Sequence, residues 1–167
     1  MRQRRRYHIK QSWQMTNIKS VITSNIEQVV AVGDSFKMVV TGYSMLPLLG
    51  FGRDTIVVRR IGTDEVIDGR IAMFRARDGR IIVHRVIGIE DDVVVLRGDG
   101  NVAQCERCRR SDVIGVVESV IRESQREVSC QSRWWRIRER MWLALPMLLR
   151  RYALGVIRRV ANYKHST

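Results

Sequence analysis

The run Ile81-Ile82-Val83-His84-Arg85-Val86-Ile87 predicts the fold of this chain more directly than any other stretch. Its β-branched residues favour an extended strand, which places Ile82, His84 and Val86 on one face. Asp78-Gly79 precedes the run and separates it from a second apolar run at residues 70–76. Because both turn residues tolerate a positive φ, this arrangement predicts a β-hairpin.

Short β-branched runs of the same kind recur along the middle of the chain, separated by turn residues. They predict six strands, at residues 36–41, 55–60, 70–76, 81–89, 93–97 and 113–121. Strands at this spacing favour a compact, mostly antiparallel β-domain, so the predicted fold class is mainly β. Before them, apolar residues at helical spacing predict one amphipathic helix, with Thr16 or Asn17 as its N-cap and Gly33 as its end.

The formal net charge of +13 is concentrated at the two ends of the chain. Residues 1–15 carry five basic residues and no acid, whereas residues 131–167 carry nine basic residues and one acid. Subtracting both ends from the 30 basic and 17 acidic residues of the chain leaves 16 of each sign in residues 16–130. We therefore predict a basic leader, one neutral domain, and a basic extension with these boundaries.

The extension, residues 131–167, alternates apolar and basic residues at helical spacing. It predicts a basic amphipathic helix that is kinked or broken near Pro146. Trp and Leu on one face with Arg on the other are typical of a helix that lies on an anionic membrane surface. Two alternatives stay open: the helix packs against its own domain or a partner, or, less favoured, its arginines bind nucleic acid.

Three cysteines, Cys105, Cys108 and Cys130, make an odd and sparse set that does not describe a disulfide framework, which favours a reducing compartment. No apolar segment follows the Arg-rich start, and the longest apolar run, Met141 to Leu149, is far shorter than the about 20 residues of a spanning helix. The sequence predicts a cytoplasmic protein without a spanning helix. Because Cys105-x-x-Cys108 lacks a full set of zinc ligands, we expect no metal and no cofactor.

The stretch Gly42-Tyr43-Ser44-Met45-Leu46-Pro47 follows the first predicted strand and points to chemistry. Gly42 lets the backbone turn and Pro47 stiffens the exit, so the Ser44 hydroxyl can point outward. A hydroxyl needs a base to attack an amide. Beyond Lys37 the β-domain contains no lysine, and His84 is its single histidine. His84 is therefore the candidate base.

An imidazole between two aliphatic residues is, by itself, more typical of a satisfied core histidine. Gly98-Asp99-Gly100-Asn101 changes that interpretation, because it follows the next predicted strand and offers a carboxylate at a glycine-flanked corner. Asp99 could fix the tautomer of the imidazole and stabilise its charged form, as the third member of a triad does. The alternative is an ordinary turn aspartate.

These three boxes, Gly-x-Ser-Met-x-Pro, His-Arg-Val and Gly-Asp-x-Asn, resemble the signal peptidase superfamily in their order and spacing, over about residues 36–121. The likeness is to its histidine-bearing branch, which includes the signal peptidases of the endoplasmic reticulum and of sporulating bacteria. The resemblance implies a serine peptidase of that β-fold, with Ser44 as nucleophile, His84 as base and Asp99 as supporting acid. Asp112, at the start of the last predicted strand, is a weaker alternative for the acid.

The resemblance also implies how such a site works. Ser44 attacks a peptide carbonyl, His84 takes the proton and returns it to the leaving amine, and water releases the acyl-enzyme. The Ser44 backbone N–H is the first oxyanion donor, and the second stays open because Gly42 stands where some relatives carry a serine. The substrate would lie as an extended strand with small residues flanking the cut. The expected substrate-binding and oxyanion residues are Gly42, Tyr43, Met45 and Pro47.

Two other functions stay open beside a serine endopeptidase that cuts a peptide or precursor protein. The self-cleaving repressor peptidases share the superfamily fold, but they resemble this chain less because they use a lysine base and usually carry a DNA-binding module. A non-catalytic adaptor would bind a membrane or nucleic acid through the basic ends. Such an adaptor would have no need of the serine, histidine and aspartate boxes together.

Overall fold

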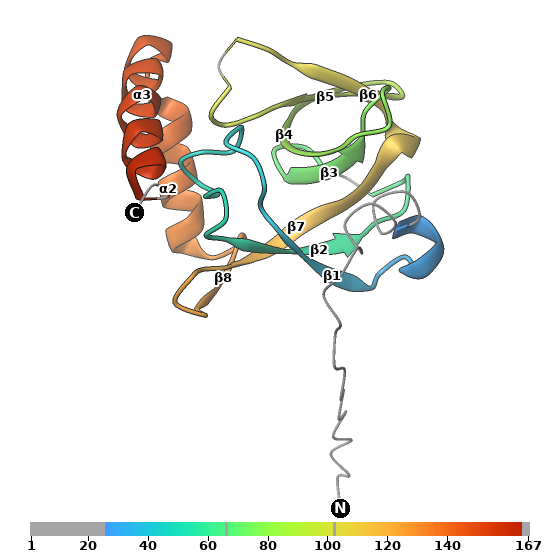
Figure 1. The fold of residues 1–167 in the computed structure, drawn as a ribbon. Coiled ribbons are helices and arrows are strands. Elements are labelled where there is room, and N and C mark those ends of the chain that lie inside the picture. The colour runs from blue at the N-terminus through green and yellow to red at the C-terminus, as the bar shows by residue number, and fades with distance from the viewer. Residues whose placement is uncertain (1–25, 66, 102, 165–167) are drawn as a thin grey trace, which may run out of the picture.

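One antiparallel sheet dominates the computed structural model, which describes residues 26–65, 67–101 and 103–164 (Figure 1). Its strands follow the order β1-β2-β7-β3-β4-β5-β6, and β8 pairs with β7. The predicted class, a mainly β antiparallel fold, is confirmed. The strands are β1 (Ser35–Val39), β2 (Thr55–Arg60), β3 (Ile71–Arg75), β4 (Ile81–Glu90), β5 (Val93–Arg97), β6 (Glu106–Arg109), β7 (Val113–Ile121) and β8 (Glu127–Ser129).

All six predicted strands are present, with ends within two residues of the predicted ones. The hairpin between β3 and β4 is also confirmed: Gly79 has a φ of +82°, and the Asp78 carboxylate accepts a hydrogen bond from the backbone N–H of Arg80 at 3.1 Å. Two short strands were missing from the prediction. β6 has a single buried side chain, Cys108, and β8 is three residues long, so neither shows the apolar alternation that marks a strand.

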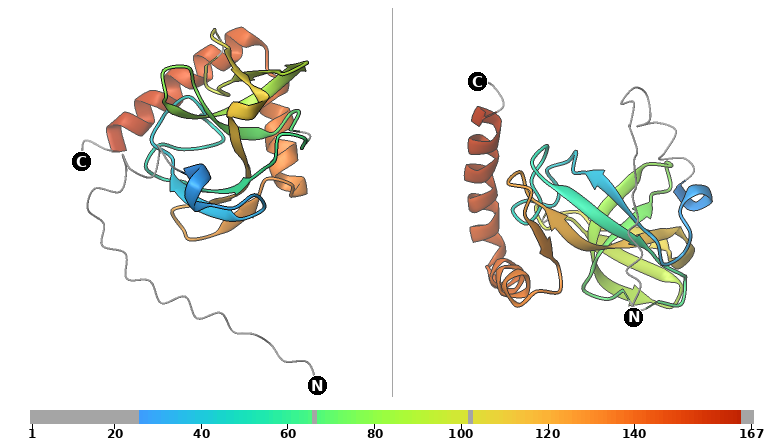
Figure 2. Two further views of the ribbon diagram at one scale, coloured as in Figure 1. Left: turned by 90° about the vertical axis from the view of Figure 1, so that its right-hand side faces the viewer. Right: turned by 90° about the horizontal axis from the view of Figure 1, so that it is seen from below.

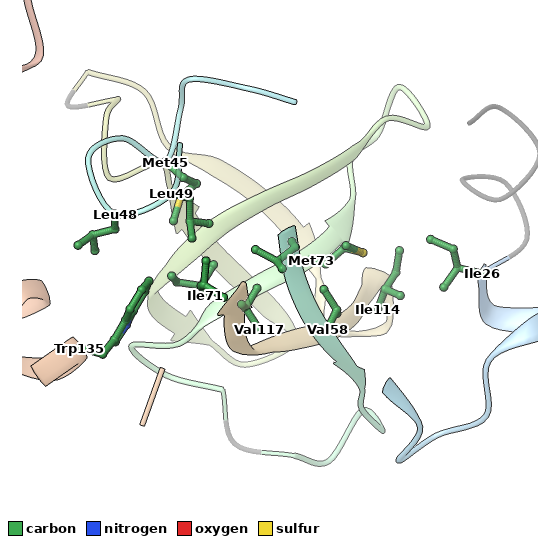
Figure 3. Packing of buried hydrophobic residues seen from close by; sticks show 12 residues of the cluster. Ile26, Met45, Leu48, Leu49, Val58, Ile71, Met73, Ile114, Val117 and Trp135 are labelled. Atoms are coloured by element: carbon green, nitrogen blue, oxygen red, sulfur yellow. The ribbon is translucent and has the colours of Figure 1, made fainter. Parts of the chain in front are cut away.

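Two groups of buried side chains fill the interior, one on each face of β3. Met73 belongs to the larger group, which Figure 3 shows, whereas Ala72 and Phe74 belong to the second. Successive side chains of a strand point to opposite faces, so β3 is buried on both sides. This explains why its sequence is almost continuously apolar instead of alternating.

The predicted N-terminal helix lies mostly outside the described residues, as do its two candidate caps and the basic leader at 1–15. Residues 26–29 are helical, and Ile26 is buried in the larger core group. Gly33 then takes a φ of +95°, and its N–H donates a hydrogen bond to the carbonyl of Arg60 at 3.0 Å. Gly33 therefore lies in the turn that leads the chain into β1.

The C-terminal helix is broken at Pro146, as predicted, into α2 (Arg133–Ala144) and α3 (Met147–Lys164). Leu145 is extended, with a ψ of 135°, because proline disfavours the helical conformation of the residue before it. From α3, the Arg150 guanidinium donates hydrogen bonds to the carbonyls of Leu143 and Leu145. These bonds satisfy carbonyl groups that the end of α2 leaves without helical partners.

Both helices lie on the same side of the sheet (Figures 1 and 2). Trp135 of α2 is buried in the larger core group, and Trp142 packs with Leu46 and with Leu154 of α3 in a third group. The start of the predicted extension therefore contributes to the same core as the strands. Of the helices in the described part of the chain, none combines the length and the apolar character needed to cross a bilayer.

Candidate active site

Ser44 and His84 line the same pocket, which has a volume of about 310 Å³. The pocket lies between β1 with the segment after it and the start of β4. Three other strands, β2, β7 and β3, separate β1 from β4 in the sheet order, so the sheet must curl to bring them together. The lining is mostly apolar and includes Met38, Val40, Leu49, Ile56, Ile81 and Val83.

The loop after β5 shows how close the two residues lie. A Cβ atom built on Gly98 would be 3.1 Å from Nε2 of His84 and 3.1 Å from Cβ of Ser44. The separation of these two atoms is therefore at most twice that distance, which a modest movement can close to a hydrogen bond between Nε2 and the Ser44 hydroxyl. The same Cβ would be 2.5 Å from the Ser44 carbonyl oxygen, so the packing here leaves no room for a side chain at position 98.

The turn that carries Ser44 is held from the inside of the domain. Met45 and Leu46 are buried, and the N–H of Leu49 donates a hydrogen bond to the carbonyl of Met45 at 3.0 Å. The N–H of Gly100 donates to the Ser44 carbonyl at 2.7 Å, which fixes the turn against the loop after β5. The backbone N–H of Ser44 forms no hydrogen bond with any other described residue, so it can serve an oxyanion.

Of the residues predicted to surround Ser44, two line the pocket and two do not. Gly42 and Met45 line the pocket. Tyr43 instead stacks on Phe51, with ring centroids 4.8 Å apart, and packs against the third core group beneath the helices. Pro47, whose peptide bond with Leu46 is cis, is not among the residues that line the pocket. Gly42 does not take a positive φ, so the turn does not use the backbone freedom that we expected of it.

His84 is 5% exposed and pairs with Ala72 across the β3–β4 ladder. Within the described residues, its Nδ1 is buried and has no hydrogen-bond partner. Burial lowers the pKa of His84, and the negative charges of Glu106 and then Asp99 act in the opposite direction. The imidazole is therefore neutral near pH 7, which is the form that can accept a proton.

Glu106 is the acidic residue that the sequence did not suggest. It lies at the start of β6, opposite Leu96 of β5, and its half-buried side chain lines the pocket with Ser44 and His84. Of the two carboxylates that act on His84, Glu106 has the larger effect on its pKa. No described cation forms an ion pair with it. The sequence indicates the position of Glu106 only weakly, because it does not predict β6.

Asp99, the predicted supporting acid, is turned toward a different partner. Its two carboxylate oxygens accept hydrogen bonds from Nε and Nη2 of Arg85 at 2.8 and 2.7 Å, and both side chains are almost fully buried. The weaker alternative, Asp112, accepts a hydrogen bond from the backbone N–H of Arg109 at 3.1 Å, at the short 3-10 helix Arg110–Asp112. Neither carboxylate therefore forms a hydrogen bond with His84 in this structure.

Arg85 links three parts of the molecule. Besides Asp99, it forms an ion pair with Glu139 of α2, and it donates a hydrogen bond to the carbonyl of Gly69 at 2.9 Å. The indole N–H of Trp142, also in α2, donates to the backbone carbonyl of Asp99 at 3.0 Å. The loop that touches Ser44 is thus fastened to β4 on one side and to α2 on the other.

No family model matches this chain, and no curated protein is significantly similar to it. The described residues contain no group of three His, Cys, Asp or Glu side chains placed to hold a metal ion. Of the Cys-x-x-Cys pair, Cys105 is exposed whereas Cys108 is buried in the second core group.

Proposed function

We propose that this protein is a serine endopeptidase of the signal-peptidase type, with Ser44 as nucleophile and His84 as general base. The observation that carries the proposal is the shared pocket: a serine and a histidine 40 residues apart line one cavity, and each has an atom 3.1 Å from the point where a Cβ on Gly98 would lie. In such a pair the imidazole must be neutral so that it can accept the proton, and it must lie close enough to reach the hydroxyl.

The proposed reaction begins when Nε2 of His84 takes the proton from the Ser44 hydroxyl, as Oγ attacks a peptide carbonyl. The negative charge that forms on the carbonyl oxygen accepts a hydrogen bond from the Ser44 backbone N–H. The imidazolium then gives its proton to the leaving amine, and water attacks the acyl-enzyme by the same route. The proposed reaction uses no metal or cofactor.

We assign the supporting acid to Glu106 in place of Asp99. A carboxylate near the imidazole stabilises the imidazolium that forms during the attack. Glu106 lines the pocket and has no ion-pair partner among the described residues, whereas Arg85 already binds both carboxylate oxygens of Asp99. Glu106 would act through His84, so it is a positioning residue.

An extended peptide fits the open strand edges that flank the pocket. In the described sheet, β1 pairs with β2 alone, and residues 81–84 of β4 pair with β3 while the pairing with β5 begins at Arg85. Both edges lie beside the pocket, so a peptide can add to either as a strand. The modest volume and apolar lining favour small apolar side chains next to the cut.

The test is to incubate the purified chain with a peptide library that spans small-residue sites and to sequence the products. We expect cleavage by the wild type and none by Ser44→Ala or His84→Ala, with unchanged circular dichroism. Ser111→Ala, at an exposed serine outside the pocket, is the matched control and should cleave normally. Cleavage that survives in Ser44→Ala, or no cleavage by the wild type of any peptide or of its own chain, would contradict the proposal.

A further inference from the structure

The outward faces of α2 and α3 carry a second set of apolar side chains. In α2, Trp135 and Trp142 point into the domain, whereas Trp134, Ile137 and Met141 are exposed. Residues at positions i, i+3 and i+7 of a helix share one face, so these three form a single stripe. Trp134 is 77% exposed and Met141 is 68% exposed, which leaves the stripe without a partner within the described residues.

The same spacing recurs in α3. Leu154 is buried, and on the opposite side of the helix Leu149, Tyr152 and Val156 are exposed at positions i, i+3 and i+7. Tyr152 is 78% exposed. Each helix therefore uses one apolar stripe to pack on the domain and presents another to the outside. We call the six outward residues of both helices the outer helix surface.

Basic residues flank the outer helix surface. Among the helix residues whose side chains the structure describes, six arginines are exposed, namely Arg133, Arg136, Arg138, Arg140, Arg151 and Arg159. Glu139 is the single acid of residues 131–167, and its carboxylate forms an ion pair with Arg85 on the inner side. The charge around the apolar stripes is therefore of one sign.

This combination restricts what can cover the surface. The basic leader at 1–15 carries five positive charges and no negative one, so it would be repelled. A second copy of the chain would bring two basic surfaces together, which is unfavourable for the same reason. Nucleic acid would neutralise the arginines, but phosphate binding leaves the six apolar side chains in water. A lipid surface with anionic headgroups satisfies the arginines and buries the apolar stripes together.

We propose that the outer helix surface binds the surface of an anionic lipid bilayer, with α2 and α3 lying in the interfacial region. This inference does not depend on the peptidase proposal. The bound orientation follows from the packing: the inner stripes hold the domain, and the outer stripes enter the headgroup layer. Since Trp142 and Leu154 pack on Leu46, two residues after Ser44, binding would hold the serine turn at a fixed position relative to the bilayer.

Binding is measured by sedimentation of the full chain with phosphatidylcholine vesicles and with vesicles that also contain phosphatidylglycerol. We expect binding to the anionic vesicles. The combined variant Trp134→Ser, Ile137→Ser, Met141→Ser should weaken it by about tenfold or more, because burial of the stripe is lost. A matched variant, Val29→Ser, Val32→Ser, Ile87→Ser, changes exposed apolar residues elsewhere and should bind like the wild type.

Trp134 also provides a direct signal. Its exposed indole should shift its emission to shorter wavelength when the anionic vesicles are added, and Trp134→Phe should lose most of that shift while binding is kept. Three results would overturn the proposal: equal binding by the wild type and the α2 variant, which would exclude the α2 stripe from the binding surface; self-association that the α2 variant abolishes; or binding to DNA without binding to vesicles.

Discussion

His84 and Arg85 are neighbours on β4, yet their side chains lie in different environments. The side chain of His84 faces a pocket, with one ring nitrogen that has no described partner and a carboxylate, Glu106, that no described cation neutralises. Arg85 is equally buried, but it is bound by Asp99 and Glu139. Burial alone therefore does not distinguish the two side chains, whereas their hydrogen-bond partners and their position relative to the pocket do.

The two environments also differ in their consequences for stability. A buried ion pair that is fully hydrogen-bonded contributes to a defined structure, and loss of one partner leaves an uncompensated charge. A buried imidazole that stays neutral avoids this cost, and it keeps the capacity to take up a proton. If the two environments have these different roles, changes around Arg85 should reduce stability and changes around His84 should reduce activity.

The largest of these effects is expected for Arg85→Met. The substitution leaves the buried carboxylate of Asp99 and the partly buried carboxylate of Glu139 without their cation, and we expect a loss of about 3–5 kcal/mol in the free energy of unfolding. Urea unfolding at pH 7 measures it. Arg80→Met removes an exposed arginine that pairs with Asp78 and should change stability by less than about 0.5 kcal/mol. Equal stability of the two variants would remove the distinction between the two environments.

The next effect is expected for Glu106→Gln, which should reduce kcat/KM by about tenfold to a hundredfold and leave stability nearly unchanged. His84 must be neutral to act as base, so activity falls as the pH drops through its pKa. The charge of Glu106 raises that pKa. Its removal should therefore shift the acid limb of the pH profile to lower pH.

Glu90→Gln is the matched control for this shift, because Glu90 is exposed and pairs with Arg107 at the far end of β4. Its pH profile should coincide with that of the wild type. An unchanged acid limb in Glu106→Gln, together with a large shift in Asp99→Asn, would return the supporting role to Asp99 in spite of its contact with Arg85.

The smallest effect is expected for Trp142→Phe. This change keeps most of the packing but removes the hydrogen bond to the Asp99 carbonyl, and it should cost about 1 kcal/mol of stability. Thermal unfolding measures the cost, with Trp134→Phe as the control at an exposed position. A loss of activity far beyond the loss of stability would show that the hydrogen bond also holds the loop beside Ser44.

Much of the fold could be predicted from the sequence, and particular strands show the physical reason. β2, β5 and β7 lie at the predicted residues because their β-branched runs are interrupted by turn residues on both sides. The break at Pro146 follows from the missing N–H of proline. The pairing of Ser44 with His84 was expected because the β-domain holds no other histidine and no lysine beyond Lys37, and the resemblance of their boxes to a known family supported it.

The parts of the site that the sequence did not predict depend on contacts between distant segments. Glu106 follows a loop and opens a strand with one buried residue, so nothing in its local sequence places it at the pocket. The partner of Asp99 was predictable in principle, because an arginine in the middle of an apolar strand needs an acid. Which acid it would find depends on how β4, the loop after β5 and α2 pack together, and no local pattern encodes that.

Because α2 is attached to the loop after β5, this loop gains its full set of contacts only late in translation. Ribosomes add Glu139 and Trp142 after every strand of the sheet has been made, and until then Arg85 lacks one of its carboxylates and the Asp99 carbonyl lacks its indole donor. The support behind the serine turn is therefore completed last during translation. In a nascent chain whose α2 has not yet left the ribosome, the serine turn lacks that support.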